Sequence, residues 1–299
     1  MIGEFYEIDP LTGAQTTIDG PSGGGGEGER ERRAKARARL NRRRAGAIRE
    51  IGQRTLALEP TDVDARRAAI AGTSREFGLP FVDPERLGID FDEDGLWGTR
   101  FLKALPGGAE AQPFLDADRG VVYKLFDLRT GGGLGKKFAV SRAASPEGWE
   151  IKVADANLFE TIEKLIVLDE CGAHPTEIVG LLLTGDHLVV KQPAAEHVPI
   201  GPAERARAAG KLGSVLVPST SIRGELRIIW HSENARPWLL GDLHPGNLMR
   251  DADGEMTIID ALIGSIPGEL TAENPVIAAA VREARSRASG PDEGQAELF

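Results

Sequence analysis

The chain has 299 residues, a length that suits one large domain or two modest ones. A hydrophobic fraction of 41% and a charged fraction of 27% are typical of a soluble globular protein, and no run approaches the roughly 18 apolar residues of a membrane-spanning helix. The single cysteine, Cys171, excludes an intramolecular disulfide and a zinc site built on several thiolates. The first residues lack the basic and apolar segments of a signal peptide, so we expect a cytoplasmic protein.

Charge is spread unevenly along the chain. The 36 basic and 46 acidic residues give a net charge of −10. Residues 27–56 hold eleven Lys or Arg against four Glu, a surplus of +7, so the remainder carries −17. Because a field of that sign repels nucleic acid, any nucleic-acid contact is expected through the basic segment 30–44. The alternative interpretation of this segment is a solvated helix or tether.

The first hundred residues divide into two parts. Residues 1–28 end in a glycine run and are expected to form a flexible leader. Residues 29–100 are expected to be a basic, helical and partly disordered region, with helices over 30–58 and 62–77 and a loop-rich stretch over 80–98.

From residue 101 the pattern becomes mixed α/β. Apolar runs bounded by turn residues predict strands, and near-helical spacing of apolar residues predicts helices. The expected strands are 121–126, 178–183, 187–190 and 256–260, and the expected helices are 154–171 and 203–212. Residues 184–186 (Thr-Gly-Asp) predict a hairpin turn between the second and third of these strands.

The strongest chemical signal lies in residues 239–249, where an apolar pair leads into a Gly/Pro turn that carries Asp242, His244 and Asn247. Asp260 follows 18 residues after Asp242, at the end of an expected strand. Two carboxylates and a carboxamide on loops around a short hairpin suit a Mg²⁺–nucleotide site, because hard cations prefer oxygen ligands and one carboxylate can take the proton of an attacking hydroxyl. We expect His244 to be a hydrogen-bonding scaffold, and Asp251 and Asp253 to be turn formers.

The sequence Gly-Asp-Leu-His-Pro-Gly-Asn at 241–247, with Asp260, resembles the catalytic and metal-binding loops of the protein-kinase-like superfamily, and is especially similar to aminoglycoside phosphotransferases. The resemblance implies a phosphotransferase that uses ATP and Mg²⁺. It implies that Asp242 is the catalytic base, and that Asn247 and Asp260 hold the metal.

Weaker parts of the same resemblance precede this loop. Gly107 and Gly108 lie where a glycine-rich hairpin would cover the phosphates, and Lys124 resembles the strand lysine that holds the α- and β-phosphates. Its implied ion-pair partner is Glu163, with Glu160 as the alternative. Residues 188–194 resemble the last strand of a kinase N-lobe entering the hinge, where Gln192 and Ala194 would meet the adenine.

The chain also departs from the family. Asp260 is followed by Ala-Leu-Ile-Gly and not by Phe-Gly, only 39 residues remain after it, and only 48 residues separate the expected hinge from Asp242. The expected fold is therefore α+β, a two-lobed protein-kinase-like fold with an abbreviated C-lobe, preceded by the helical N-terminal region. We expect an N-lobe over 101–193, a short C-lobe over 194–285 and a tail over 286–299.

This compact layout, over about 102–270, resembles the minimal Ser/Thr/Tyr kinase domains of phage and mobile-element polyvalent proteins, which implies a bacterial or phage-encoded protein with a protein substrate or partner. Three alternatives stay open: an inactive kinase-fold interaction module, a small-molecule kinase like the aminoglycoside enzymes, and transfer of AMP in place of phosphate. The intact Lys124, Asp242, Asn247 and Asp260 favour catalysis over the first of these.

Overall fold

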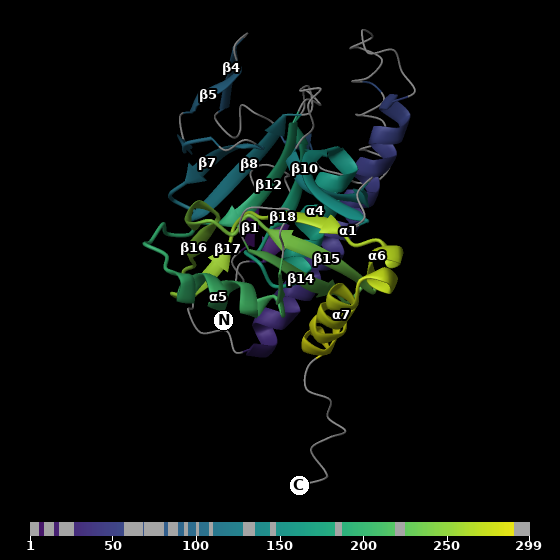
Figure 1. The fold of residues 1–299 in the computed structure, drawn as a ribbon. Coiled ribbons are helices and arrows are strands. Elements are labelled where there is room, and N and C mark those ends of the chain that lie inside the picture. The colour runs from purple at the N-terminus through teal and green to yellow at the C-terminus, as the bar shows by residue number, and fades with distance from the viewer. Residues whose placement is uncertain are drawn as a thin grey trace. The chain divides into compact units, whose positions relative to one another are not determined.

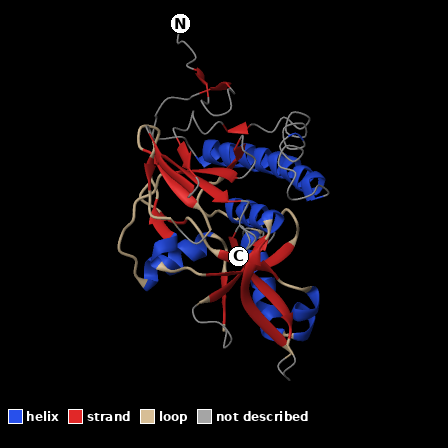
Figure 2. Ribbon diagram, turned by 90° about the horizontal axis from the view of Figure 1, so that it is seen from above, coloured by secondary structure: helices blue, strands red, loops and turns tan. Residues whose placement is uncertain are grey.

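The structure is a computed structural model with mixed α+β architecture (Figures 1 and 2). It describes residues 6–8, 15–17, 27–56, 68, 81–82, 89–92, 95–99, 102–107, 110–127, 135–143, 148–182, 187–218 and 225–289. The chain forms two compact units, the first from Met1–Gly135 with Thr176–Pro193 and the second from Lys136–Pro175 with Ala194–Phe299. Residues 101–193, which we predicted as one lobe, are thus shared between the two units. Among the described helices, none has the length and apolar character needed to cross a membrane.

The first unit contains a six-stranded sheet in the order β3-β11-β12-β8-β7-β6, antiparallel except for the parallel β3–β11 pair. Its elements are β1 (Tyr6–Ile8), β2 (Gln15–Thr17), α1 (Glu27–Leu56), β3 (Phe81–Val82), β4 (Ile89–Asp92), β5 (Gly95–Thr99), β6 (Lys103–Ala104), β7 (Gln112–Asp116), β8 (Val121–Asp127), β11 (Glu177–Leu182) and β12 (His187–Pro193). The apolar face of this sheet buries Phe114, Tyr123, Leu125 and Val189 in one cluster.

Helix α1 packs against β11, which corrects the interpretation of the basic segment as a solvated helix or tether. Ile48 and Ile51 are buried on the packed face. Two polar side chains are buried with them and bond to the backbone of β11 and the residue before it. Asn41 donates to the Thr176 carbonyl and accepts from the Ile178 N–H, and Arg44 donates to the Ile178 carbonyl. Since buried polar groups cost free energy unless they are hydrogen-bonded, these bonds fix where the helix docks.

The second unit is built on a four-stranded antiparallel sheet in the order β13-β14-β15-β18, and α7 packs on its β13 and β14 strands (Figure 1). Its elements are β9 (Gly135–Arg142), β10 (Trp149–Ala156), α4 (Leu158–Glu170), α5 (Pro202–Lys211), β13 (Val215–Val217), β14 (Leu226–His231), β15 (Arg236–Gly241), a 3₁₀ turn (Pro245–Asn247), β16 (Leu248–Arg250), β17 (Met256–Ile258), β18 (Leu262–Ser265), α6 (Gly268–Glu273) and α7 (Pro275–Ala288).

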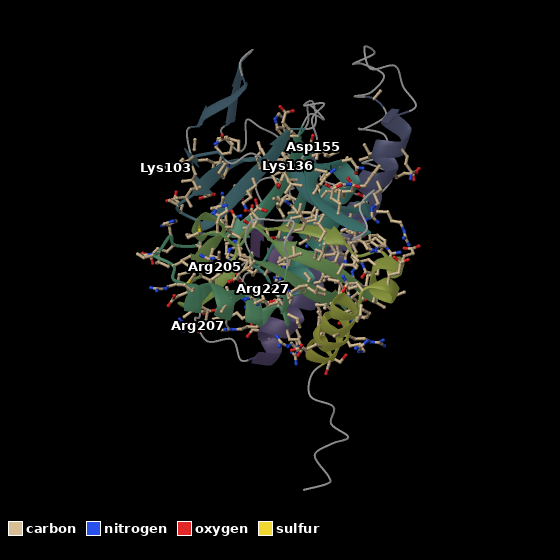
Figure 3. All side chains as sticks on the ribbon, in the orientation of Figure 1. Lys103, Lys136, Asp155, Arg205, Arg207 and Arg227 are labelled. Carbon is tan, nitrogen blue, oxygen red and sulfur yellow. The ribbon has the colours of Figure 1, made fainter. Side chains whose placement is uncertain are left out.

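Apolar clusters cover both faces of this second sheet. One contains Val167 and Leu168 of α4 with Leu240 of β15, and the other contains Leu239 of β15 with Ala284 of α7. Neighbouring residues of one strand point to opposite faces, so the Leu239–Leu240 pair supplies both clusters and β15 is buried on both sides. The hairpin of β9 and β10 carries an ion pair between Lys136 and Asp155, which lie together in Figure 3.

Most of the predicted elements after residue 101 are confirmed. The strands predicted from 121, 178, 187 and 256 correspond to β8, β11, β12 and β17, and the helix predicted over 203–212 corresponds to α5. The helix predicted over 154–171 begins later, because Ala154–Ala156 belong to β10 and the Asn157 side chain caps α4. Three predictions are corrected: the leader over 1–28 contains β1 and β2, the loop-rich stretch 80–98 contains β3 and β4 and most of β5, and the tail expected from 286 begins later because α7 continues to Ala288. The predictions on residues 62–67, 69–77, 184–186 and 290–299 lie outside the described residues.

Candidate functional site

Strand register brings Asp242 and Asp260 to the same end of the paired strands β15 and β18 in the second sheet. Gly241, the last residue of β15, pairs with Leu262, the first residue of β18. In an antiparallel pair, the end of one strand lies beside the beginning of the other. Asp242 therefore leaves the sheet where Asp260 approaches it.

The short hairpin of β16 and β17 brings Asn247 to the same place. Leu248 pairs with Ile258 at the open end of this hairpin, and the next residues continue the ladder, since the Ile259 N–H donates to the Asn247 carbonyl at 2.9 Å. Asn247 therefore lies opposite Ile259, the residue that precedes Asp260. The three residues predicted to form the metal and catalytic site thus meet at the mouth of one hairpin, beside the end of β15.

The side chain of Asn247 orients Asp242. Its amide nitrogen donates to the Asp242 carbonyl at 2.8 Å and to Asp242 Oδ2 at 3.2 Å. Because the nitrogen faces Asp242, the amide oxygen is the atom of Asn247 that can serve as a metal ligand. Asp242 has a φ of 61°, a left-handed conformation that non-glycine residues adopt at a cost of about 1–3 kcal/mol and that is concentrated at functional sites.

His244 acts as a scaffold, as expected. Its Nδ1 accepts a hydrogen bond from the Gly246 N–H at 3.0 Å and so caps the 3₁₀ turn. A neutral ring with this bond carries its proton on Nε2, which lies 3.9 Å from Asp242 Oδ1. The proton-bearing side of the ring is thus turned towards the carboxylate that was predicted to be the base.

Lys164 of α4 is a site residue that the sequence analysis missed. Its side chain is 3% exposed, and its Nζ lies 3.4 Å from Asp260 Oδ1, which also accepts from the Ala261 N–H at 2.8 Å. Lys164 lies three residues after the buried Thr161 and four before the buried Leu168. This helical spacing on the buried face of α4 was the signal that could have revealed it, because residues at i, i+3 and i+4 share one side of a helix.

Phe138 of β9 packs tightly beneath the site. An added Cβ at Gly241 would lie 2.7 Å from the Phe138 ring, and one at Gly264 of β18 would lie 2.2 Å from the Phe138 carbonyl oxygen. Glycine at both positions therefore allows β9 to approach the two strands that deliver Asp242 and Asp260.

The structure assigns Glu160 to a partner other than Lys124. Its carboxylate accepts from the Asn157 N–H, which completes a capping box for α4, and forms an ion pair with Lys137 of β9. Burial raises the pKa of Glu160, but the hydrogen bonds from Lys137 and the Asn157 N–H outweigh it and hold that pKa below its ordinary value.

Lys124 lies in the middle of β8, half-buried, between Val190 of β12 and Pro113 of β7. It belongs to the first unit and Glu163, half-buried on α4, belongs to the second. Their pairing stays a prediction.

The predicted nucleotide-binding residues lie mainly in loops and at a strand end. Gly107 is exposed in the connection between β6 and β7, where Gln112 donates to the Leu105 carbonyl at 2.9 Å, and Gly108 lies outside the described residues. The Gln192 side chain is buried near the end of β12 and donates to Thr176 Oγ1 at 2.8 Å. The adenine contact stays a prediction. Ala194 follows β12 and is half-buried.

The donor set fits a small, hard divalent cation such as Mg²⁺, because Asp242, Asn247 and Asp260 all offer oxygen atoms. Within the described part of the chain, no three His, Cys, Asp or Glu side chains gather into a metal-binding group. The site therefore consists of two carboxylates supplemented by one amide, with the ammonium of Lys164 beside Asp260. In comparisons with known proteins, no family model, no curated protein and no solved structure matches this chain.

Proposed function

We propose that this chain is an ATP- and Mg²⁺-dependent phosphotransferase that transfers the γ-phosphoryl group of ATP to a hydroxyl group of a protein. One observation carries the proposal: the β15–β18 and β16–β17 registers bring Asp242, Asn247 and Asp260 together at one end of these strands. Oxygen donors from two loops suit a metal that neutralises phosphate charge. The left-handed backbone of Asp242 adds support, because such conformations are concentrated at functional sites.

In the proposed reaction Asp242 accepts the proton of the acceptor hydroxyl. The hydroxyl oxygen forms a bond to the γ-phosphorus, the bond from that phosphorus to the β–γ bridging oxygen breaks, and ADP leaves. The hydrogen bonds from Asn247 hold the Asp242 carboxylate in one orientation during this transfer.

The Asn247 amide oxygen and the Asp260 carboxylate would hold Mg²⁺, which when bound neutralises the phosphate charge. Lys164 positions Asp260 through their ion pair. The expectation that Lys124 holds the α- and β-phosphates and pairs with Glu163 stays a prediction from the sequence.

The test is a transfer assay with the purified chain, Mg²⁺, ATP radiolabelled at the γ-phosphate and a mixture of protein acceptors. We expect incorporation of label, and a loss of about 100-fold or more in Asp242→Asn and Asp260→Asn, because each substitution removes one carboxylate charge while the side-chain shape is kept. The matched control is Asp253→Asn, an exposed residue of the turn between β16 and β17, which should retain activity.

Three results would overturn the proposal or part of it. Label transfer that survives both site substitutions would remove the assigned roles. ATP binding without any transfer by the unmodified chain would indicate an interaction module. A mass increase that corresponds to AMP would show that the opposite end of the nucleotide is transferred.

A further inference from the structure

Helix α1 has two faces that differ in charge. At about 100° per residue, Asn41, Arg44, Ile48 and Ile51 fall within one arc, and all four are buried on the side that packs against β11. The opposite arc, about 120° wide, carries no apolar side chain and holds six basic residues and two acidic ones, Glu31 and Glu50. These basic residues, all exposed, are Arg32, Lys35, Arg39, Arg42, Arg43 and Arg49. We call them the basic stripe.

The docking of α1 is what gives the stripe a fixed direction. In an undocked helix every arginine would be exposed to solvent, and no face would have a fixed direction. Here the hydrogen bonds that Asn41 and Arg44 form with residues 176 and 178 hold one face against the sheet. The inward arginine is also paired with Glu177 at 2.9 Å, so it does not contribute to the outer face. The stripe is therefore a row of cations on a rigid support.

We propose that the basic stripe of α1 binds the phosphate backbone of double-stranded nucleic acid, without reading its sequence. This proposal is independent of the proposed phosphotransferase activity. Charge complementarity carries it: residues 27–56 hold a surplus of +7, whereas the rest of the chain carries −17 and repels a polyanion. A polyanion that approaches this protein is therefore attracted most strongly to the segment that contains α1.

Three features favour a duplex over other polyanions. Ten of the eleven basic residues in α1 are arginine, whose planar guanidinium binds phosphate oxygens with two hydrogen bonds. The stripe runs from Arg32 to Arg49, about 27 Å at 1.5 Å per residue, which matches about 8 base pairs at 3.4 Å each. The helix contains no Phe, Tyr or Trp, so it offers no platform on which the bases of a single strand could stack.

Glu31 and Glu50 lie within the arc of the stripe, and the ion pair of Glu31 sets the choice of variants. Glu31 forms an ion pair with Lys35 four residues on, and the hydrogen bond and charge of Lys35 hold the pKa of Glu31 below its ordinary value. Lys35 is thus partly neutralised within the helix. Arg39, Arg42 and Arg43, at the centre of the stripe, are the residues to change.

The experiment measures binding of a fluorescein-labelled DNA duplex of about 20 base pairs by fluorescence anisotropy, over a series of salt concentrations. The stripe variant is Arg39→Gln, Arg42→Gln and Arg43→Gln combined. The control is Lys103→Gln, Arg236→Gln and Arg282→Gln combined, which removes the same charge from exposed positions elsewhere. A duplex RNA and a single-stranded DNA of equal length serve as further probes.

We expect the unmodified chain to bind the duplex at low salt, with an affinity that falls steeply as salt rises. The stripe variant should bind at least tenfold more weakly, and its slope of log K against log salt should be shallower by about 2 to 3, since each lost phosphate contact removes about 0.9. The control variant should bind like the unmodified chain.

No binding by the unmodified chain at low salt would overturn the proposal, as would equal losses in the two variants. Tighter binding of polyglutamate than of duplex, with the same loss in the stripe variant, would replace it with an acidic protein partner. Circular dichroism and thermal unfolding of both variants check that the three exposed substitutions leave the fold intact, because the side chains that dock α1 are unchanged.

Discussion

At the scale of single residues, the feature to explain is the buried ammonium of Lys164, which contacts Asp260 of the candidate site. Burying a charge costs several kcal/mol, and replacing a buried ion pair by apolar side chains is often neutral for stability. The contact of Lys164 with Asp260, next to Asn247, leads to the prediction that the cation serves the proposed site more than the fold.

Lys164→Met tests this role. Methionine keeps the length and apolar stem of lysine, and Asp260, whose side chain is 38% exposed, stays solvated without its partner. We therefore expect a free energy of unfolding within about 2 kcal/mol of the unmodified chain, measured by urea denaturation. In the phosphotransfer assay we expect a loss of about 100-fold, because one fixed charge at the site is removed.

The control is Lys152→Met at an exposed position of β10, which should leave both measurements unchanged. Lys164→Arg, which keeps a positive charge, should recover part of the activity. Stability lost by more than about 3 kcal/mol with activity retained would instead make Lys164 a structural residue.

At the scale of the element, β9 and the two strands that deliver the acidic residues fit together only through glycine. A Cβ on Gly264 would lie 2.2 Å from the Phe138 carbonyl oxygen, a backbone atom that cannot rotate away. We expect Gly264→Ala to destabilise the second unit by about 1–3 kcal/mol or more, measured by urea denaturation, because overpacking forces backbone shifts.

Gly268→Ala is the matched control for this substitution. No atom lies within 4 Å of an added Cβ at Gly268, the first residue of α6. Alanine there should leave stability unchanged or raise it by up to about 1 kcal/mol, since it restricts the unfolded chain. Equal stability of the two variants would show that β9 does not pack on β18 as described.

Elements were predictable from the sequence where local signals agree, and were missed where tertiary contacts decide. The β11 and β12 strands are apolar runs on either side of turn residues, and they were found. Residues 154–156 are helix-permissive, yet they lie in β10 because strand pairing with β9 overrides local preference. The run 226–231, which is β14, lacks alternation, so periodicity alone does not separate it from a buried helix.

The same distinction holds for the candidate site. Asp242 and Asn247 were found because the chemistry and the turn lie in one short stretch, and Asp260 because a strand precedes it. Lys164 was missed because the residue that it contacts, Asp260, lies 96 positions away. The docking of α1 was missed for the same reason, since Asn41 bonds to residues 135 and 137 positions away.

At the scale of the whole molecule, acid should weaken the first unit through Glu177. Burial raises the pKa of Glu177, but the charges of Lys191 and Arg44 outweigh it and hold that pKa below the ordinary value of 4.5. A carboxylate with a lowered folded-state pKa gives stability that is complete above its unfolded pKa and is lost as the pH falls through its folded pKa. Glu177 therefore stabilises the first unit at neutral pH and stops doing so in acid.

Glu177→Gln should lower the opening free energy of β11 and α1 by about 1.5–3 kcal/mol near neutral pH, because Arg44 and Lys191 lose their shared carboxylate. The difference from the unmodified chain should shrink as the pH falls below 4.5, where the natural residue becomes protonated as well. Hydrogen exchange of the β11 amides measures this, with the β14 amides of the second unit as an internal reference. Glu283→Gln on α7, an exposed carboxylate, should change neither set, and a difference at β11 that stays constant at every pH would refute the role of Glu177.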